Sequence, residues 1–236
     1  MSSFQRLAWN DVPVLLRANP ATLRDWLERR SSHTAFCVLA IVFGAGIYGA
    51  VIGCWRGDGQ AYYTGLKLPL LFLLTTLGNG LINGMLAPLL GLNLTGRQCL
   101  TVILMTFAIT TLVLGALAPV AAFVVWNNAP LTPGTTLTSP EYGLMQLTLF
   151  GFIALAGVIG NVALVPLLRE TSGSARVAHR VLCAWVSVNL LLGSQICWVL
   201  RPFIWDPVRP VEFLGPEYFR GSFYETIFEA ARRLLF

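Results

Sequence analysis

Charged residues are scarce in this sequence of 236 residues: Asp, Glu, Lys and Arg make up 11% of it, against 56% for hydrophobic residues. A soluble domain carries about 25% charged residues, because it must present a polar surface to water. The shortage of charge therefore excludes a soluble globular protein, and the hydrophobic content excludes a disordered chain. Cysteine is also sparse, at 5 residues, which excludes a small protein built on disulfide bonds. A polytopic membrane protein is the class that remains.

Five apolar stretches predict an all-α membrane protein, a bundle of five transmembrane helices with an amphipathic helix at each end of the chain. Each stretch is long enough to cross about 30 Å of hydrocarbon, which takes roughly 20 helical residues. None has an acid or a base inside it. Together they predict a transmembrane domain over residues 34–200. The predicted spans are Thr34–Trp55, Leu68–Leu92, Leu100–Trp126, Tyr142–Leu168 and Val181–Leu200.

The distribution of arginine and lysine predicts the orientation of the chain, because positively charged loops stay in the cytoplasm. The loops on the far side of the first span carry only Arg56 and Lys67. This bias predicts a cytoplasmic N-terminus and an extracytoplasmic C-terminus, and we expect a bacterial cytoplasmic membrane. Because the net charge of +5 comes from residues at membrane borders, it does not indicate nucleic-acid binding. The side of the N-terminus carries Arg6, Arg17, Arg24, Arg29, Arg30, Arg97, Arg169, Arg176 and Arg180.

The N-terminal segment, residues 1–33, is predicted to be cytoplasmic and amphipathic. Asn19-Pro20 is typical of a helix start, since asparagine caps the first free N–H groups and proline fits the first turn. Leu23 and Trp26 then share one face of the helix. We expect this helix to lie along the bilayer surface with Trp26 at the level of the headgroups. Packing against a neighbouring protein is the alternative.

The C-terminal segment, residues 201–236, is predicted to be extracytoplasmic, with a stretch rich in proline and aromatic residues before a terminal helix. Ser222 and Glu225 have the spacing of a capping box, in which two side chains satisfy free N–H groups at a helix start. An apolar helix face follows, which must be covered by the lipid surface or by a partner subunit. That face includes Tyr224, Ile227, Phe228, Leu234 and Leu235.

Small and amide residues inside the spans predict close helix packing. Gly80 and Gly84 have the four-residue spacing that lets two helix backbones approach, and Asn79 and Asn83 place two amides on one face. An amide facing lipid alone is costly, so each should meet another helix or water. Interhelical hydrogen bonding is the main interpretation, and a polar path for a solute is the other. Further candidates are Gly49, Gly53, Gly157, Gly160, Asn161, Asn189 and Gln195.

Several catalytic and metal-binding patterns are missing from the sequence. It has no HExxH or CxxC motif, no Gly-x-Ser-x-Gly elbow and no phosphate-binding glycine loop. Its two histidines, His33 and His179, lie at the predicted membrane borders. We therefore expect no catalytic residue, no metal site and no cofactor. Cys54 and Cys197 lie at comparable depths in the first and fifth spans, which leaves open a disulfide or two packed thiols.

The five closely spaced spans behind a cytoplasmic N-terminal region resemble the Yip1-like group of membrane proteins. The resemblance covers about Thr34–Leu200 and includes the apolar stretches Gly44–Gly49 and Leu66–Phe72. It implies a five-span architecture and assigns no site residues.

The function predicted from the sequence is that of a non-catalytic integral membrane subunit or scaffold. Its expected partners are the lipid bilayer and other integral membrane subunits or a second copy of the chain. The alternative is a channel or carrier for a small neutral solute, lined by Asn79, Asn83, Asn161 and Asn189.

Overall fold

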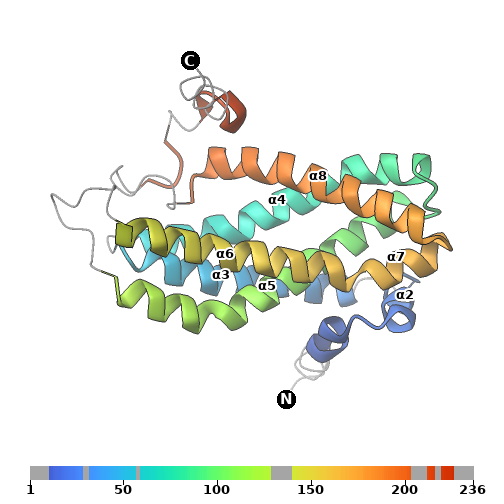
Figure 1. The fold of residues 1–236 in the computed structure, drawn as a ribbon, viewed down its shortest axis with the longest axis horizontal. Helices are drawn as coiled ribbons and strands as arrows, with labels where there is room; N and C mark the ends of the chain where they lie inside the picture. The colour runs from blue at the N-terminus through green and yellow to red at the C-terminus, as the bar shows by residue number, and fades with distance from the viewer. Residues whose placement is uncertain are drawn as a thin grey trace.

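A computed structural model gives the fold (Figure 1), and it describes residues 11–28, 32–56, 59–128, 140–202, 212–215 and 219–225. These residues form helices joined by short connections, with no strand in the described ranges. A helical segment over residues 11–17 precedes the labelled helices. The labelled helices are α2 (Pro20–Glu28), α3 (Ser32–Gly53), α4 (Gln60–Leu89), α5 (Gly96–Trp126), α6 (Pro140–Ala163), α7 (Val165–Ser172) and α8 (Ala175–Leu200).

The fold class predicted from the sequence is confirmed. Within the described residues, five segments are long and apolar enough to cross a membrane. They correspond to α3, α4, α5, α8 and the two consecutive helices α6 and α7. The segments are His33–Gly53, Gln60–Leu89, Gly96–Trp126, Gly143–Ser172 and Ala175–Leu200.

The bundle has a three-helix centre and two peripheral helices. α3 packs most extensively against α4 and α5, whereas α6 packs mainly on α5 and α8 mainly on α4. The most apolar stretch of α5 is 61% buried and that of α8 is 11% buried, so α8 lies at the edge. We call the end of the bundle that holds α2, α7 and the α4–α5 turn the α2 end. The opposite end, which residues 212–215 approach, is the tail end.

The second spanning helix begins earlier than the sequence suggested. α4 starts at Gln60 rather than Leu68, so Lys67 lies inside the helix and is only 1% exposed. The expectation that no span contains an acid or a base was therefore wrong at this position. Pro69 does not end the helix, which continues to Leu89.

The last two spans also differ from the prediction at their ends. The fourth is interrupted at Leu164, and a short helix, α7, follows with Pro166 in its first turn. The fifth, α8, starts at Ala175 rather than Val181, because Ser174 caps it by accepting a hydrogen bond from the N–H of Val177. The helix therefore continues past the apolar stretch into charged sequence.

The N-terminal helix is capped as predicted, since the N–H of Ala21 donates to Asn19 Oδ1 at 3.1 Å. The expectation for Trp26 was wrong. Trp26 is only 4% exposed, stacks on the ring of His33 at 4.2 Å between centroids, and meets Phe36 edge-on. The helix folds back onto the start of α3, so its apolar face is covered by the chain itself and Trp26 is not available to a membrane surface or a partner.

None of the five cysteines forms a disulfide bond within the described residues. Cys54 and Cys197 therefore form no disulfide in this structure, and Cys54 lies exposed at the tail end, just after α3.

Candidate functional site

A chain of three asparagine amides joins α4 to α8 inside the bundle. Asn83 Nδ2 donates to Asn79 Oδ1, and Asn79 Nδ2 donates in turn to Asn189 Oδ1. Asn79 Nδ2 also approaches the carbonyl oxygen of Trp185 at 3.4 Å. Asn79 and Asn83 are both 0% exposed. The two amides that the sequence placed on one helix face are thus satisfied across a helix interface, and we call this group the amide chain.

The register between α4 and α8 follows from four-residue spacing on both helices. Because the helices are antiparallel and residues four apart share a face, Asn79 meets Asn189 while Thr75 meets Gly193 one turn away. Thr75 Oγ1 would lie 3.9 Å from a methyl group at Gly193. In the other direction the same spacing brings Asn83 to the level of Trp185. The amide chain is therefore the centre of a polar seam along a largely apolar interface.

Two polar atoms at the Asn83 end of the seam have no hydrogen-bond partner within the described chain. They are Asn83 Oδ1 and Trp185 Nε1, an acceptor and a donor that both lie buried. Burying an unpaired polar atom costs about 1–3 kcal/mol. Asn83 therefore contributes less to the seam than Asn79, which uses both of its side-chain polar atoms.

The other amides predicted from the sequence do not join the amide chain. Asn161 Nδ2 donates to the carbonyl oxygen of Gly157 in its own helix, at 2.8 Å. Gln195 Oε1 accepts from the N–H of Phe223, at 3.4 Å. Within the described residues Asn161 thus makes no hydrogen bond across helices, and Gln195 contacts the C-terminal segment instead of α4.

The C-terminal segment over residues 219–225 lies along α8 (Figure 1). The hydroxyl of Tyr224 donates to the carbonyl oxygen of Leu191 at 2.6 Å and lies 2.7 Å from the Ser194 hydroxyl. The predicted capping box is present, since the N–H of Glu225 donates to Ser222 Oγ and the N–H of Ser222 donates to Glu225 Oε2, both at 3.1 Å. Tyr224 thus contacts its own chain. Ile227, Phe228, Leu234 and Leu235 lie outside the described residues.

Glycines bring the helix backbones of the bundle into close contact. A methyl group at Gly49 would lie 2.6 Å from the carbonyl oxygen of Thr64, and one at Gly53 would lie 2.7 Å from that of Gln60. Both positions therefore seat α3 directly on α4. A methyl group at Gly84 would lie 3.2 Å from the Cα of Gly96 in α5, so these two helices also approach closely. A methyl group at Gly80 would overlap the side chain of Leu100.

The two candidate glycines of α6 differ in their surroundings. A methyl group at Gly160 would lie 2.7 Å from the carbonyl oxygen of Thr106, so this glycine seats α6 on α5. Gly157 has no atom within 4 Å of the same position. Sequence spacing alone could not separate them, because residues three apart are neighbours on the helix surface and the position of α5 decides which of them it covers.

Lys67 is a buried residue that sequence reasoning placed in a loop. Its Nζ donates to the carbonyl oxygen of Glu212 at 3.1 Å and lies 5.6 Å from the centroid of the Phe213 ring. Phe213 in turn meets Tyr63 of α4 edge-on at 5.8 Å. Lys67 thus joins the tail to α4 at the tail end. Residues 60–65 contain the polar Gln60 and Thr64, and for that reason the hydrophobic pattern did not extend the helix back to them.

A second missed contact ties α3 to α6. The hydroxyl of Tyr48, which is fully buried, donates to the carbonyl oxygen of Leu149 at 2.8 Å. Tyrosine within an apolar run gives no signal of its partner, since any backbone carbonyl can accept the bond.

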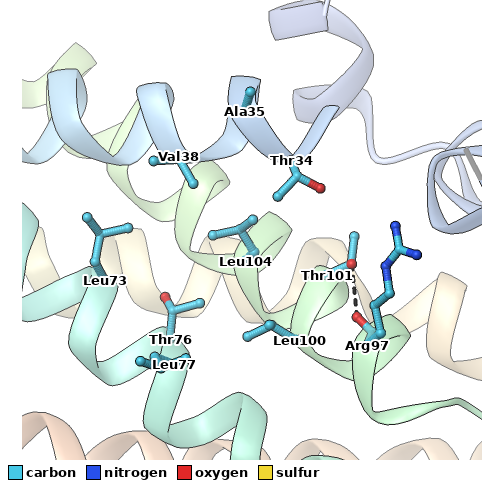
Figure 2. Close-up of a pocket in the computed structure, with 10 residues that line it drawn as sticks. All are labelled: Thr34, Ala35, Val38, Leu73, Thr76, Leu77, Arg97, Leu100, Thr101 and Leu104. Atoms are coloured by element: carbon cyan, nitrogen blue, oxygen red, sulfur yellow. Dashed lines mark hydrogen bonds between the residues drawn. The ribbon is translucent and has the colours of Figure 1, made fainter. Parts of the chain in front are cut away.

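A cavity of about 630 Å³ opens at the α2 end between α3, α4 and α5 (Figure 2). Its walls are mainly apolar and include Val38, Leu73 and Leu104. Arg97, from the first turn of α5, lies at its rim. The amides of the seam do not line it. We call this cavity the α3–α5 groove.

No group of three or more His, Cys, Asp or Glu side chains able to hold a metal ion occurs among the residues that the structure describes. The chain matches no known family model, no curated protein and no solved structure. The resemblance to the Yip1-like group therefore stays a prediction from the sequence. What the structure establishes is an all-helical protein with five helices that are apolar and long enough to cross a membrane.

Proposed function

We propose that this protein is a non-catalytic membrane scaffold that holds a neighbouring membrane-spanning helix against one side of α6. The observation that carries the proposal is the contrast between Gly160 and Gly157. α5 occupies the space beside Gly160, whereas no atom of the described chain lies within 4 Å of a methyl group placed at Gly157. A glycine in a spanning helix allows a second backbone to approach, and Gly157 leaves that position free for another chain.

The residues around Gly157 support a protein partner on this side of α6. Ala154 is exposed and Asn161 is half-buried, so the surface around Gly157 is small and partly polar. A small surface lets a helix approach closely, and an amide beside it can bond across the interface. The amide of Asn161 donates to the carbonyl oxygen of Gly157 in its own helix, so its Nδ2 has a hydrogen-bond partner even when no other chain is present.

The peripheral position of α8 offers a second apolar surface to the bilayer or to a partner. Leu190 and Leu191 are 69% and 56% exposed, whereas the seam with α4 uses the opposite side. The most apolar stretches of the two peripheral spans are 28% and 11% buried, so both leave apolar surface for the bilayer or for a partner.

The channel hypothesis has less support. It needs Asn79, Asn83 and Asn189 to face a solute, but these amides bond to one another and two of them are fully buried. Their bonds favour the interpretation that they hold α4 and α8 together.

We further propose that the α2 end lies in the cytoplasm, in a bacterial cytoplasmic membrane. Arg97, Arg169 and Arg176 all lie at this end, in the α4–α5 turn region, α7 and the start of α8. Positive residues of short loops stay on the cytoplasmic side.

The test compares two substitutions on α6 in the full-length protein, extracted from its native membrane into a mild detergent. Gly157→Leu should remove the co-purified partner or second copy, because the larger side chain blocks the approach of another helix. Gly151→Leu is the matched control, since Gly151 also has no atom within 4 Å but lies about 120° around α6 from Gly157. Equal recovery of partner with Gly157→Leu and with the wild type would contradict the proposal.

A further inference from the structure

The α3–α5 groove lies between the first turns of α3 and the facing turns of α4 and α5. Gly46 of α3 faces Gly65 of α4, and from Gly46 back to the start of α3 at Ser32 is about four helical turns. α4 and α5 continue past that level, since Gly84 still faces Gly96 near their turn. The groove lies short of that end, at the level of Thr34 and Val38 in α3 and of Leu73 and Leu77 in α4.

The walls of the groove suit a hydrocarbon chain. Leu73 and Leu77 line it from α4, and Leu100 and Leu104 line it from α5. The hydroxyls of Thr76 and Thr101 also reach it, but each donates to a carbonyl oxygen of its own helix, that of Phe72 or of Arg97. Their hydrogen-bonding protons are therefore already used, and the walls present mostly methyl and methylene groups.

The rim of the groove suits an anion. Arg97 is the charged residue among the described residues that line it, and Arg97 has no carboxylate partner within the described chain. Figure 2 shows the Thr34 hydroxyl and the Arg97 guanidinium on the same side of the opening. Arginine presents a fork of N–H donors that matches the oxygen atoms of a phosphate group.

We propose that the groove binds one anionic phospholipid, with an acyl chain along its leucine walls and the phosphate at Arg97 and Thr34. The volume of about 630 Å³ lies within the range of about 300–1,000 Å³ found for sites that bind small molecules. An arginine at the end of a spanning helix lies at the depth of lipid headgroups, where it attracts anionic lipids. The proposal does not depend on the scaffold function.

Native mass spectrometry of the full chain, reconstituted with defined lipids, tests the proposal. The probes are phosphatidylglycerol, which is anionic, and phosphatidylcholine, which is zwitterionic. We expect the wild type to retain one phosphatidylglycerol in preference to phosphatidylcholine. Arg97→Gln should lower that preference about fivefold, which is the usual contribution of one cationic side chain near an anionic lipid.

The matched control is Arg176→Gln. Arg176 is the second residue of α8 as Arg97 is the second residue of α5, and both are exposed, but Arg176 does not line the groove. Its substitution should leave the lipid preference unchanged. An equal loss in both variants would show a general surface attraction and would overturn the proposal.

A second variant fills the groove without changing its charge. Ala35 lines the groove and is exposed, so Ala35→Trp should occupy the space and leave the packed interior intact. We expect this variant to melt at the wild-type temperature and to lose the bound phosphatidylglycerol. A photoreactive group in the middle of the acyl chain should label α4 and α5 in the wild type and not in Ala35→Trp. Retained lipid, labelling elsewhere, or a protein segment found in the groove would each overturn the proposal.

Discussion

Asn79 of α4 and Asn189 of α8 are joined by a hydrogen bond between their side-chain amides, and this bond fixes a peripheral helix to the centre of the bundle. Little else of α8 is buried, since its most apolar stretch is only 11% covered. The attachment of α8 therefore depends strongly on the amide chain.

Asn79→Leu should destabilise the protein by about 1–3 kcal/mol, because it removes the hydrogen-bond partner of the buried Asn83 and of the half-buried Asn189. Unfolding by titration with a denaturing detergent, followed by circular dichroism, measures this free energy. A double-mutant cycle with Asn189→Leu should give a coupling of about 0.6–1.7 kcal/mol. Asn161→Leu is the control and should change the stability by less than about 0.5 kcal/mol, since Asn161 bonds only within α6. Additive effects of the two seam substitutions would contradict the bond.

Asn83→Leu should lower the free energy of unfolding by about 1 kcal/mol or less, and by less than Asn79→Leu does. Both residues are fully buried, so burial alone does not explain the difference. The leucine removes one donor to Asn79 but also removes an Oδ1 acceptor that has no partner in the described chain. The same unfolding measurement tests the order of the two variants. A larger loss for Asn83→Leu than for Asn79→Leu would mean that Asn83 Oδ1 is paired after all.

Gly44→Ala should destabilise the protein by about 1–3 kcal/mol through overpacking. A methyl group at Gly44 would overlap the backbone carbonyl of Thr111 in α5, where α3 and α5 also meet at Gly115. Gly151→Ala is the matched control: it meets nothing within 4 Å and should stabilise α6 by about 0.5–1 kcal/mol through helix propensity. Similar melting temperatures for the two alanine variants would contradict the close approach of α3 and α5.

Lys67→Met should release the tail from α4 while keeping the volume of the side chain. The variant loses the hydrogen bond from Lys67 Nζ to the carbonyl oxygen of Glu212. Hydrogen exchange of the backbone amides in residues 212–215 should become about fivefold to tenfold faster, as expected for the loss of one hydrogen bond. Arg56→Met removes another cation at the tail end and should leave the exchange rates of these residues unchanged. Unchanged exchange in Lys67→Met would show that the tail is held by other contacts.

The proposed orientation predicts which cysteines react outside the cell. In a variant that keeps only Cys54, which is exposed at the tail end, a membrane-impermeant maleimide should label intact cells. A cysteine placed by Asn93→Cys in the α4–α5 turn, with the five native cysteines replaced, should be labelled only after permeabilisation. The reverse pattern would place the α2 end outside and contradict the arginine distribution.

The fold was predictable because lipid demands long apolar helices, and this demand can be read from the sequence without knowing any contact. The helix starts were less predictable. α4 extends back to Gln60 through polar residues, and its buried Lys67 contacts Glu212 and Phe213 of the distant tail. The hydrophobic pattern alone does not show which residues a distant segment of the chain will bury.

The candidate site was predictable in part. Four-residue spacing placed Asn79 and Asn83 on one face, but only the register between α4 and α8 selects Asn189 as their partner. Trp26 had the features of a residue at the membrane surface, yet His33 and Phe36 cover it. The α3–α5 groove left no pattern in the sequence, because its lining residues come from three helices that are far apart in the chain.

The mass of the particle that carries the wild-type chain, measured after mild extraction from its own membrane, tests the proposed scaffold most directly. We predict a mass greater than that of one chain with its bound lipid, from a second protein or a second copy seated beside Gly157. A wild-type particle that contains one chain and lipid alone would contradict the proposal.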